Sequence, residues 1–387
     1  MTTTDPIPFN RPAVEGHELA YVREAIESGH LSAGGAFGAR AAGLLREATG
    51  ASEVLLTTSC TSALELAALM LDLQPGDTVV VPSFTFTTTA LAFARQGARL
   101  VFCDIERTTL GLDPGHLASL IDDSVRAVVA VHYAGVACDL EGVQRVLAEH
   151  PDVTLIEDNA HGLFGRWRGL PLGSFGRFAS QSFHDTKNFV AGEGGALLLN
   201  DQADVARARI LYDKGTDRQA FLLGQVDKYS WKDTGSSFGL SETLAAYLLA
   251  QLERREAIQS KRRELHEHYR AALAPYAGQL GFEIAPELPE RDPAWHMFYV
   301  LLPDLDSRTA VMSAMRAQDI QTAFHYVPLH SSVAGRRFTA RTTDCPVTEE
   351  ISARLLRLPF FNDLGDDADR VVAAFLAAVQ ELEPARG

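Results

Sequence analysis

The sequence is poor in cysteine and in positive charge. Its four cysteines, Cys60, Cys103, Cys138 and Cys345, are scattered and form no C-x-x-C pair, so neither a disulfide framework nor a structural zinc site is expected. The 35 Lys and Arg residues against 50 Asp and Glu residues give a net charge of −15. A surface of this sign repels nucleic acid and anionic membranes, so neither is an expected partner.

Long hydrophobic runs are also missing. The longest apolar candidate, residues 63–73, is interrupted by Glu65 and Asp72, so we expect no membrane-spanning helix. The first six residues contain neither the basic region nor the apolar stretch of a secretory signal. We therefore expect a soluble, reduced, cytoplasmic protein, and 387 residues predict two or three domains.

Short apolar strands alternate with helices in the first two thirds of the chain. These strands are rich in Val, Ile and Leu over nearly their whole length, which is typical of a parallel sheet covered by helices on both faces. A further pair of strands is joined only by a loop. The expected strands are residues 53–57, 78–81, 99–104, 125–132, 153–158, 177–183 and 195–200.

The pattern changes near residue 240. A charged helical run over residues 240–273 predicts a connector that leaves the large domain. The remaining chain predicts a smaller α+β domain with strands at residues 296–302 and 322–327 and helices at residues 308–318, 349–356 and 366–382. We expect a large domain of residues 1–250, with a mostly parallel sheet, and a small C-terminal domain of residues 251–387.

A lysine stands directly after one of these strands. The segment Ser-Phe-His-Asp-Thr-Lys-Asn places Lys187 on a loop, and the glycine-rich residues 191–195 follow it. Glycine permits unusual backbone angles or a close approach to a ligand. Lys187 is either a surface lysine before a turn or a lysine whose amine condenses with a carbonyl cofactor.

An acid ends another predicted strand. Asp158 lies in Ile-Glu-Asp-Asn-Ala-His, at the carboxyl edge where open α/β sheets bind ligands. Pyridoxal phosphate (PLP) needs an acid at its ring nitrogen, because a protonated ring accepts electrons from a carbanion. The alternative for Asp158 is a helix cap.

Small hydroxyl residues lead into a predicted helix that begins near Thr61, in the segment Thr-Thr-Ser-Cys-Thr-Ser-Ala of residues 57–63. Free N–H groups and the helix dipole favour a phosphate there, although an ordinary capped helix start fits the same pattern. Ser182 could add a hydroxyl group to such a phosphate site. Phe86, which also follows a strand, could stack on a flat ring or lie in the core.

The histidines offer a rival interpretation. His325 and His330 flank Tyr-Val-Pro-Leu, but Pro328 argues against the helix on which paired metal ligands would be expected. We therefore expect no metal.

Together these segments resemble the sugar aminotransferases of the DegT/DnrJ/EryC1/StrS family, over about residues 7–364. Its branch that makes dTDP-4-amino-4,6-dideoxyhexoses is similar in several further stretches. They are residues 7–12, 132–138, 214–216, 224–231, 235–238 and 324–330. The resemblance implies the aspartate-aminotransferase fold (PLP fold type I), pyridoxal 5′-phosphate as cofactor, and a homodimer.

The resemblance also implies roles for individual residues. Lys187 would bind the cofactor covalently and act as general base and acid, while Asp158 would face the pyridine nitrogen. The other cofactor contacts would be Cys60, Thr61, Phe86, His161, Ser182 and Ser237. Lys214, Arg218 and Lys228 either bind the diphosphate of the substrate as a local basic patch or are solvated surface charges, and His325 is a further candidate substrate contact.

Two positions depart from the family pattern. The family often has Gln where His161 stands, and most members have Asn at the position of Ser237, which reaches the phosphate from the neighbouring subunit. The implied reaction transfers an amino group from glutamate to C4 of dTDP-4-keto-6-deoxyglucose. A 3-keto sugar or a cyclitol as substrate, and a non-catalytic protein of this fold, stay open as alternatives.

Overall fold

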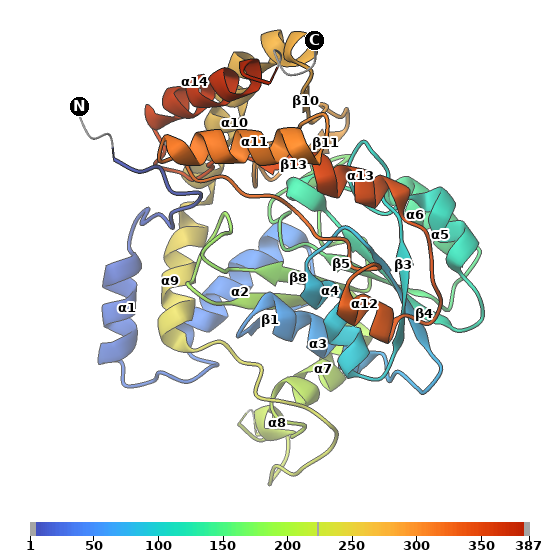
Figure 1. The fold of residues 1–387 in the computed structure, drawn as a ribbon. Coiled ribbons are helices and arrows are strands. Elements are labelled where there is room, and N and C mark those ends of the chain that lie inside the picture. Colours follow the sequence, from blue (N-terminus) through green and yellow to red (C-terminus); the bar gives the residue numbers. More distant parts are fainter. Residues whose placement is uncertain (1–4, 223, 383–387) are drawn as a thin grey trace.

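The computed structural model describes residues 5–222 and 224–382. Within them, a seven-stranded sheet has the order β1-β9-β8-β5-β4-β2-β3. Strands β2, β3, β4, β5 and β8 run parallel, while β9 is antiparallel to both β8 and β1. The parallel strands therefore end at one edge of the sheet, where the loops that follow them come together (Figure 1).

The strands expected from the sequence are confirmed, with ends that shift by at most one residue. The apolar runs predicted them because their side chains are buried on both faces of the sheet. The strands are β1 (Glu53–Thr57), β2 (Thr78–Pro82), β3 (Arg99–Cys103), β4 (Val125–Val131), β5 (Thr154–Asp158), β8 (Phe178–Ser182) and β9 (Gly195–Leu199).

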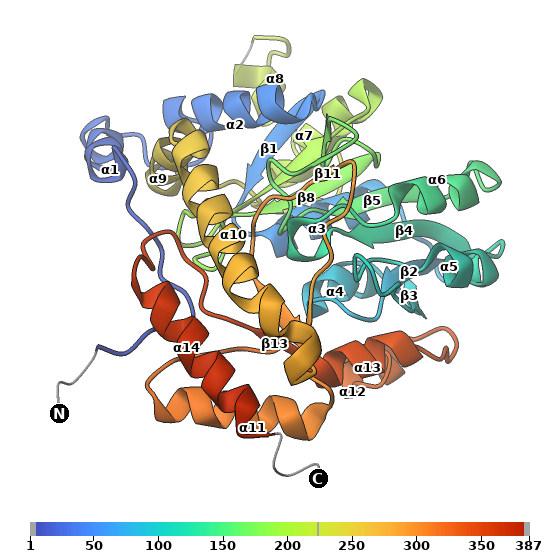
Figure 2. The same ribbon diagram turned by 90° about the horizontal axis from the view of Figure 1, so that it is seen from above.

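Helices cover both faces of this sheet (Figures 1 and 2). One face packs against α3 (Cys60–Met70), α4 (Thr87–Arg95) and α7 (Val205–Tyr212). The other packs against α2 (Ala36–Thr49), α9 (Glu242–Glu253), α5 (Pro114–Leu120) and α6 (Leu140–Ala148), and α1 (Glu18–Glu27) lies on α9. Short η1 (Tyr133–Gly135), η2 (Gln202–Asp204) and α8 (Arg218–Leu222) lie in the connections.

A second core lies in the C-terminal part. A three-stranded sheet of β10 (Glu283–Ile284), β12 (Tyr299–Leu301) and β13 (Leu355–Arg357) packs with α10 (Arg255–Leu280), α11 (Leu305–Ala317) and α14 (Asp367–Gln380). Ile7 belongs to this core. Leu329 and Cys345, although they come late in the chain, pack in the core between the seven-stranded sheet and α3, α4 and α7. The remaining elements are β6 (Arg166–Trp167), β7 (Leu170–Pro171), β11 (Arg291–Asp292), α12 (Val333–Phe338) and α13 (Pro346–Arg354).

Three expectations for the second half of the chain are wrong. The helical run over residues 240–273 is two helices, because Arg254, at φ −100° and ψ 14°, interrupts it between α9 and α10. Residues 322–327 form no strand beyond a bridge from Ala323 to Arg357, since this segment lines a cavity. The helix expected to reach residue 356 ends at Arg354, and β13 follows it.

No helix in the described residues is long and apolar enough to cross a membrane. All four cysteines are free, and Cys103, Cys138 and Cys345 are buried. The division of the chain at residue 250 stays a prediction.

Candidate active site

A cavity of about 520 Å³ opens where β2, β4, β5 and β8 end, and its size is typical of a cofactor site. Segments far apart in the sequence meet there, including β13 from the small sheet. Eight of the residues that the sequence suggested line it, namely Cys60, Thr61, Phe86, Asp158, His161, Ser182, Lys187 and His325.

Asp158 ends β5 and is 6% exposed. Its Oδ2 accepts a hydrogen bond of 2.6 Å from Thr89 Oγ1, and its Oδ1 accepts one of 3.2 Å from the backbone N–H of Ala160. Ser180 Oγ, on the neighbouring strand, lies 3.5 Å from Oδ1. These donors stabilise a carboxylate in one orientation at the cavity wall.

Glu157, the residue before Asp158, is fully buried. Its Oε1 accepts from the N–H groups of Phe175 and Gly176 at 2.7 Å each, and its Oε2 accepts from that of Gly173 at 2.8 Å. His132 Nε2 lies 2.8 Å from Oε2. Because successive strand residues point to opposite faces, this clamp directs Asp158 toward the cavity.

The amino end of α3 forms another wall. Ser59 caps the helix by accepting a hydrogen bond of 3.1 Å from the N–H of Ser62, which leaves the first turn at Cys60 and Thr61 facing the cavity. A Cβ at Gly195 would lie 2.4 Å from the backbone nitrogen of Cys60, so only glycine lets β9 pass this close. Ser182 lines the same cavity. Such a helix end suits a phosphate group.

Lys187 lies on the loop between β8 and β9 and is partly buried. Burial lowers the pKa of its ammonium group to about 8; Arg357 acts in the same direction, while Cys60 and Asp158 oppose it. The neutral amine is therefore more abundant near neutral pH than that of an ordinary lysine, whose pKa is about 10.4. A neutral amine is the form that attacks a carbonyl group.

His161 contributes a polar atom without a partner. Its imidazole stacks on that of His296 with 4.2 Å between ring centroids, and its buried Nδ1 has no hydrogen bond to any described residue. Burial holds the pKa of His161 well below its usual range, and Lys187 adds to the effect, so the ring is neutral. Phe86 presents a side chain that is 58% exposed to the same cavity.

His325 connects the cavity to the small sheet. Arg357 Nη1 lies 2.7 Å from His325 Nε2, and His325 Nδ1 lies 3.1 Å from the hydroxyl of Tyr133. Since arginine can only donate, Nε2 accepts and Nδ1 carries the proton. Burial lowers the pKa of His325 to about 2, with Arg357 and Lys187 acting in the same direction.

Four of the residues predicted for the site do not line this cavity. Arg218 begins α8, and Lys214, Lys228 and Ser237 lie in the segments on either side of it; α8 itself is on the side of the molecule opposite α14 (Figures 1 and 2). Lys214 Nζ lies 2.7 Å from Asp213 Oδ1, and Arg218 Nη1 lies 3.6 Å from Asp213 Oδ2. Their predicted roles stay predictions.

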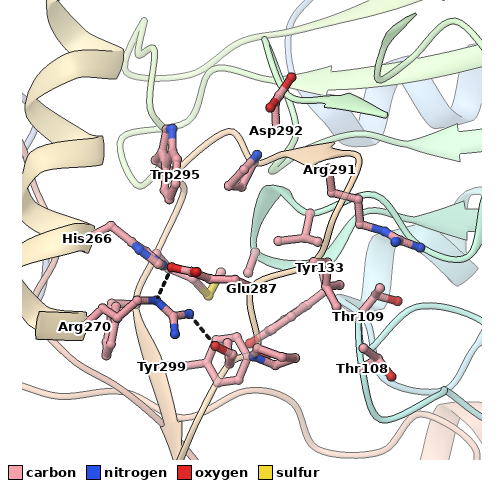
Figure 3. A pocket seen from close by; sticks show the side chains of 18 residues that line it. Thr108, Thr109, Tyr133, His266, Arg270, Glu287, Arg291, Asp292, Trp295 and Tyr299 are labelled. Atoms are coloured by element: carbon pink, nitrogen blue, oxygen red, sulfur yellow. Dashed lines mark hydrogen bonds and ion pairs between the residues drawn. The ribbon is translucent and has the colours of Figure 1, made fainter. Parts of the chain in front are cut away.

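A smaller cavity of about 260 Å³ lies on another side of Tyr133, between η1 and the segment before β12 (Figure 3). Arg270 points into it and forms an ion pair of 3.2 Å with Glu287. Its lining contains none of the residues that the sequence suggested for the site. Among the described residues, no group of three metal-ligating side chains was found.

The main cavity fits pyridoxal phosphate. It combines a lysine amine, a carboxylate fixed by hydrogen bonds, an open helix amino end, an exposed aromatic ring and the unpartnered Nδ1 of His161. Each is a group that this cofactor requires or accepts at its carbonyl, ring nitrogen, phosphate or ring substituents. Fold and cavity together define an aminotransferase of PLP fold type I.

The chain belongs to the DegT/DnrJ/EryC1/StrS aminotransferase family, which its sequence matches over residues 12–376. The family resemblance and the fold type expected from the sequence are thereby confirmed, as is the cofactor, pyridoxal 5′-phosphate. The protein is a PLP-dependent aminotransferase of a family of sugar aminotransferases.

Solved structures agree with this assignment. The aminotransferase TlmJ from Streptoalloteichus hindustanus is 29% identical, with 98% of this chain and 100% of that chain covered and a TM-score of 0.89. DesV from S. venezuelae is 27% identical, with coverages of 97% and 99% and a TM-score of 0.85. The putative sugar aminotransferase Spr1654 from Streptococcus pneumoniae, in its PMP form, is 24% identical and shares the fold, with coverages of 97% and 99% and a TM-score of 0.89.

The sequence reasoning missed three residues of this site. Thr89 stands one helical turn after Phe86, and Ser180 stands two residues before Ser182, so the periods of helix and strand could have indicated both. Arg357 is the only charged residue in the apolar run Leu-Leu-Arg-Leu-Pro, and a charge in a buried strand is a signal that was available.

We expect Thr89→Val to weaken the hold on the cofactor. The substitution keeps the shape of the side chain but removes the hydroxyl that donates to Asp158 Oδ2. A hydrogen bond to a charged group contributes about 1.5–3 kcal/mol, so the Kd for PLP should rise about ten- to a hundredfold. Thr89→Ser keeps the hydroxyl and should bind PLP nearly as tightly. Equal affinities for all three proteins in equilibrium dialysis would contradict this role.

We expect the reactivity of Lys187 in the apo-protein to rise with pH through a midpoint near its pKa of about 8. Below that pH the protonated amine is not nucleophilic, and above it the reaction should reach a plateau. Trace acetylation by acetic anhydride at a series of pH values, with mass spectrometry of the peptides, measures the midpoint. Bound PLP should protect Lys187 from the label. A midpoint near the ordinary value of about 10.4, or no protection, would contradict the prediction.

Proposed function

We propose that the protein transfers an amino group from glutamate to C4 of dTDP-4-keto-6-deoxyglucose. The observation that carries the transamination is the single cavity that brings Lys187, Asp158 and the amino end of α3 together. The choice of sugar rests on the resemblance to the dTDP-4-amino-4,6-dideoxyhexose branch, in the stretches at residues 132–138, 224–231 and 324–330. The four free cysteines are consistent with work in a reducing cytoplasm.

Each part of the cavity has a separate task in this proposal. Asp158 would hold the proton of the ring nitrogen, because Thr89 and Ala160 fix its carboxylate against the cavity. The amino end of α3 and Ser182 would hold the phosphate. Phe86 would cover the ring face, and Nδ1 of His161 would contact the ring hydroxyl. When bound, PLP supplies an electron-accepting ring that stabilises negative charge on the carbon next to the amine.

Lys187 would carry the proton. Its free amine would be a general base of suitable strength, since a pKa near the working pH favours transfer in both directions. It would take the proton from the α-carbon of glutamate and hold it inside the cavity, where the bound cofactor would supply the electron-accepting ring. In the second half of the reaction it would move a proton to C4 of the sugar, so that one residue serves both halves.

A non-catalytic protein of this fold is a weaker candidate. A scaffold needs neither an amine with a lowered pKa nor a carboxylate fixed by two hydrogen bonds in the same cavity. A 3-keto sugar or a cyclitol would use the same half-reaction with glutamate, so the amino acceptor has to be distinguished by experiment.

We infer a homodimer from the family resemblance and from exposed apolar side chains. Around α8, Trp231 is 83% and Tyr229 is 55% exposed, and on α1 Leu19 is 74% exposed. Side chains of this size prefer a partner surface to water. In the dimer, the segment around Ser237, with Lys214 and Arg218, would reach the partner's cavity. A local basic cluster of this kind would bind the diphosphate of the substrate despite the net charge of −15.

At nucleotide-sugar concentrations well below the raised KM of Arg218→Ala, we expect mixed dimers to be more active than either parent. Lys187→Ala removes the reactive amine, and Arg218→Ala removes a cation that we place in the partner's site. A hybrid then contains one cavity with both residues intact. Sedimentation should give a dimer, and activity after mixing should exceed the sum of the parents. A fully active monomer, or hybrids no more active than the parents, would refute the arrangement.

We expect the amine-loaded enzyme to convert dTDP-4-keto-6-deoxyglucose and to leave 3-keto sugars largely unused. Mass spectrometry of the products from a panel of nucleotide keto-sugars measures this, and the Lys187→Ala variant is the control. Arg218→Ala should raise the KM for the nucleotide sugar about ten- to a hundredfold and spare the glutamate half-reaction, because one charge-assisted hydrogen bond is lost. Turnover of a 3-keto sugar alone would overturn the proposed substrate.

A further inference from the structure

The smaller cavity, of about 260 Å³, lies against the wall of the main one, and the two have no lining residue in common. The ring of Tyr133 lines the smaller cavity, while its hydroxyl lies 3.1 Å from Nδ1 of His325, which lines the main cavity. The next pair divides in the same way, since Trp295 lines the smaller cavity and His296 the main one. A ligand in the smaller cavity therefore does not displace PLP.

The walls of the smaller cavity are largely aromatic (Figure 3). The imidazole of His266 lies 4.9 Å from the ring of Trp295 and 5.0 Å from that of Phe298, measured between ring centroids, and both contacts are edge-to-face. Burial lowers the pKa of His266 to about 4, and Arg270 acts in the same direction, so this imidazole is neutral near pH 7. Tyr299 adds a further ring to the lining. Such walls favour a planar aromatic ligand, because ring edges and ring faces attract one another.

One cation points into this cavity. Arg270 enters it from α10, and its Nη2 donates to the backbone carbonyl of Ala285 (Figure 3). Its buried Nε has no hydrogen-bond partner among the described residues, although Glu287 Oε1 lies 3.2 Å away in an ion pair. The side chain of Glu287 is 79% exposed, and a pair with so exposed an acid is weak. Arg270 therefore has a donor that a ligand can use once Glu287 turns into the water.

The lining indicates which kind of anion fits. Arg291, the other cation of the lining, already donates its Nε to the carbonyl of Ala137 at 3.0 Å, so Arg270 is the candidate anion partner. A planar guanidinium group matches the two oxygens of a carboxylate. A phosphate carries nearly two charges and has three acceptor oxygens. The wall near Arg270 offers it few donors, because Pro286, Leu288 and Met297 are apolar.

We propose that the smaller cavity binds a small aromatic carboxylate, with the carboxylate on Arg270 and the ring against His266, Trp295 and Tyr299. The ligand displaces Glu287, which compensates the charge of Arg270 when no ligand is bound. This site is separate from the PLP cavity and does not depend on the transamination proposed above.

The probe 4-fluorobenzoate tests the proposal, because its ¹⁹F signal reports weak binding directly. The PLP-bound protein should bind it saturably. Arg270→Met should raise the Kd about ten- to a hundredfold, because a charge-assisted hydrogen bond is lost. Glu287→Gln should lower the Kd about two- to fivefold, because the acid that competes for Arg270 is removed. Glu287 is exposed, so this second variant carries the test if Arg270→Met does not fold.

Arg354 and Glu283 provide a matched pair of controls. The side chain of Arg354 is 14% exposed, against 23% for Arg270, and its Nε donates to the carbonyl of Leu302 at 2.7 Å. It forms an ion pair with Glu283, which is 62% exposed, and neither residue lines the smaller cavity. Arg354→Met and Glu283→Gln should leave the Kd of the probe unchanged. Shifts equal to those of Arg270→Met and Glu287→Gln would show a general effect of charge and would overturn the proposal.

The ring of the ligand is tested by competition. Benzoate should displace the probe about two- to tenfold more strongly than cyclohexanecarboxylate, which has the same charge and a similar size but no aromatic ring. Equal competition would overturn the choice of an aromatic ligand.

Three other results would refute the site itself. They are a lack of saturable binding up to about 10 mM, an unchanged Kd in both Arg270→Met and Glu287→Gln, and displacement of the probe by PLP. Binding of the probe involves no keto-sugar and no amino donor. Failure of every nucleotide keto-sugar to react would therefore refute the proposed acceptor and leave this site intact.

Discussion

The buried carboxylate of Glu157 is the interaction on which the site depends. It accepts hydrogen bonds from three backbone N–H groups in residues 173–176 and lies in hydrogen-bonding contact with His132. It thereby fastens the loop before β8 to the end of β5. The alternation of a strand then places Asp158 on the opposite face, where Thr89 from α4 meets it. The carboxylate of the cavity is thus oriented by the sheet itself and not by a mobile loop.

Charge is distributed unevenly within the cavity. Asp158 is surrounded by hydrogen-bond donors. Lys187 and Arg357 are two cations in a region of low dielectric, and Arg357 makes ionisation of Lys187 less favourable. Burial also lowers the pKa of Arg357, although arginine stays charged. The three stacked imidazoles of His161, His296 and His325 are neutral for the same reason. A site of this kind favours ligands that bring negative charge, as the phosphate of PLP does.

The small sheet contributes to the chemistry as well as to the architecture. β13 carries Arg357, and the adjacent irregular segment carries His325 and Tyr326, so part of the cavity wall comes from the C-terminal part of the chain. Among the described residues, the segment has no strand partner beyond the bridge at Ala323, and its consecutive residues His325 and Tyr326 both line the cavity. The exposed aromatic residues around α8 are side chains that the proposed dimer would cover.

The sequence by itself determined the parallel sheet, because strands buried on both faces must be apolar along their whole length, and that pattern is local. It also pointed to Lys187, Asp158 and the amino end of α3 as candidates, since each lies at the end of such a strand or within a few residues after it. Only the tertiary structure decided the break at Arg254, the strand at residues 355–357 and the partners of Asp158. The contacts of Thr89 with Asp158 and of Arg357 with His325 join segments far apart in the sequence, so local patterns can mark these residues as candidates but cannot show which of them meet.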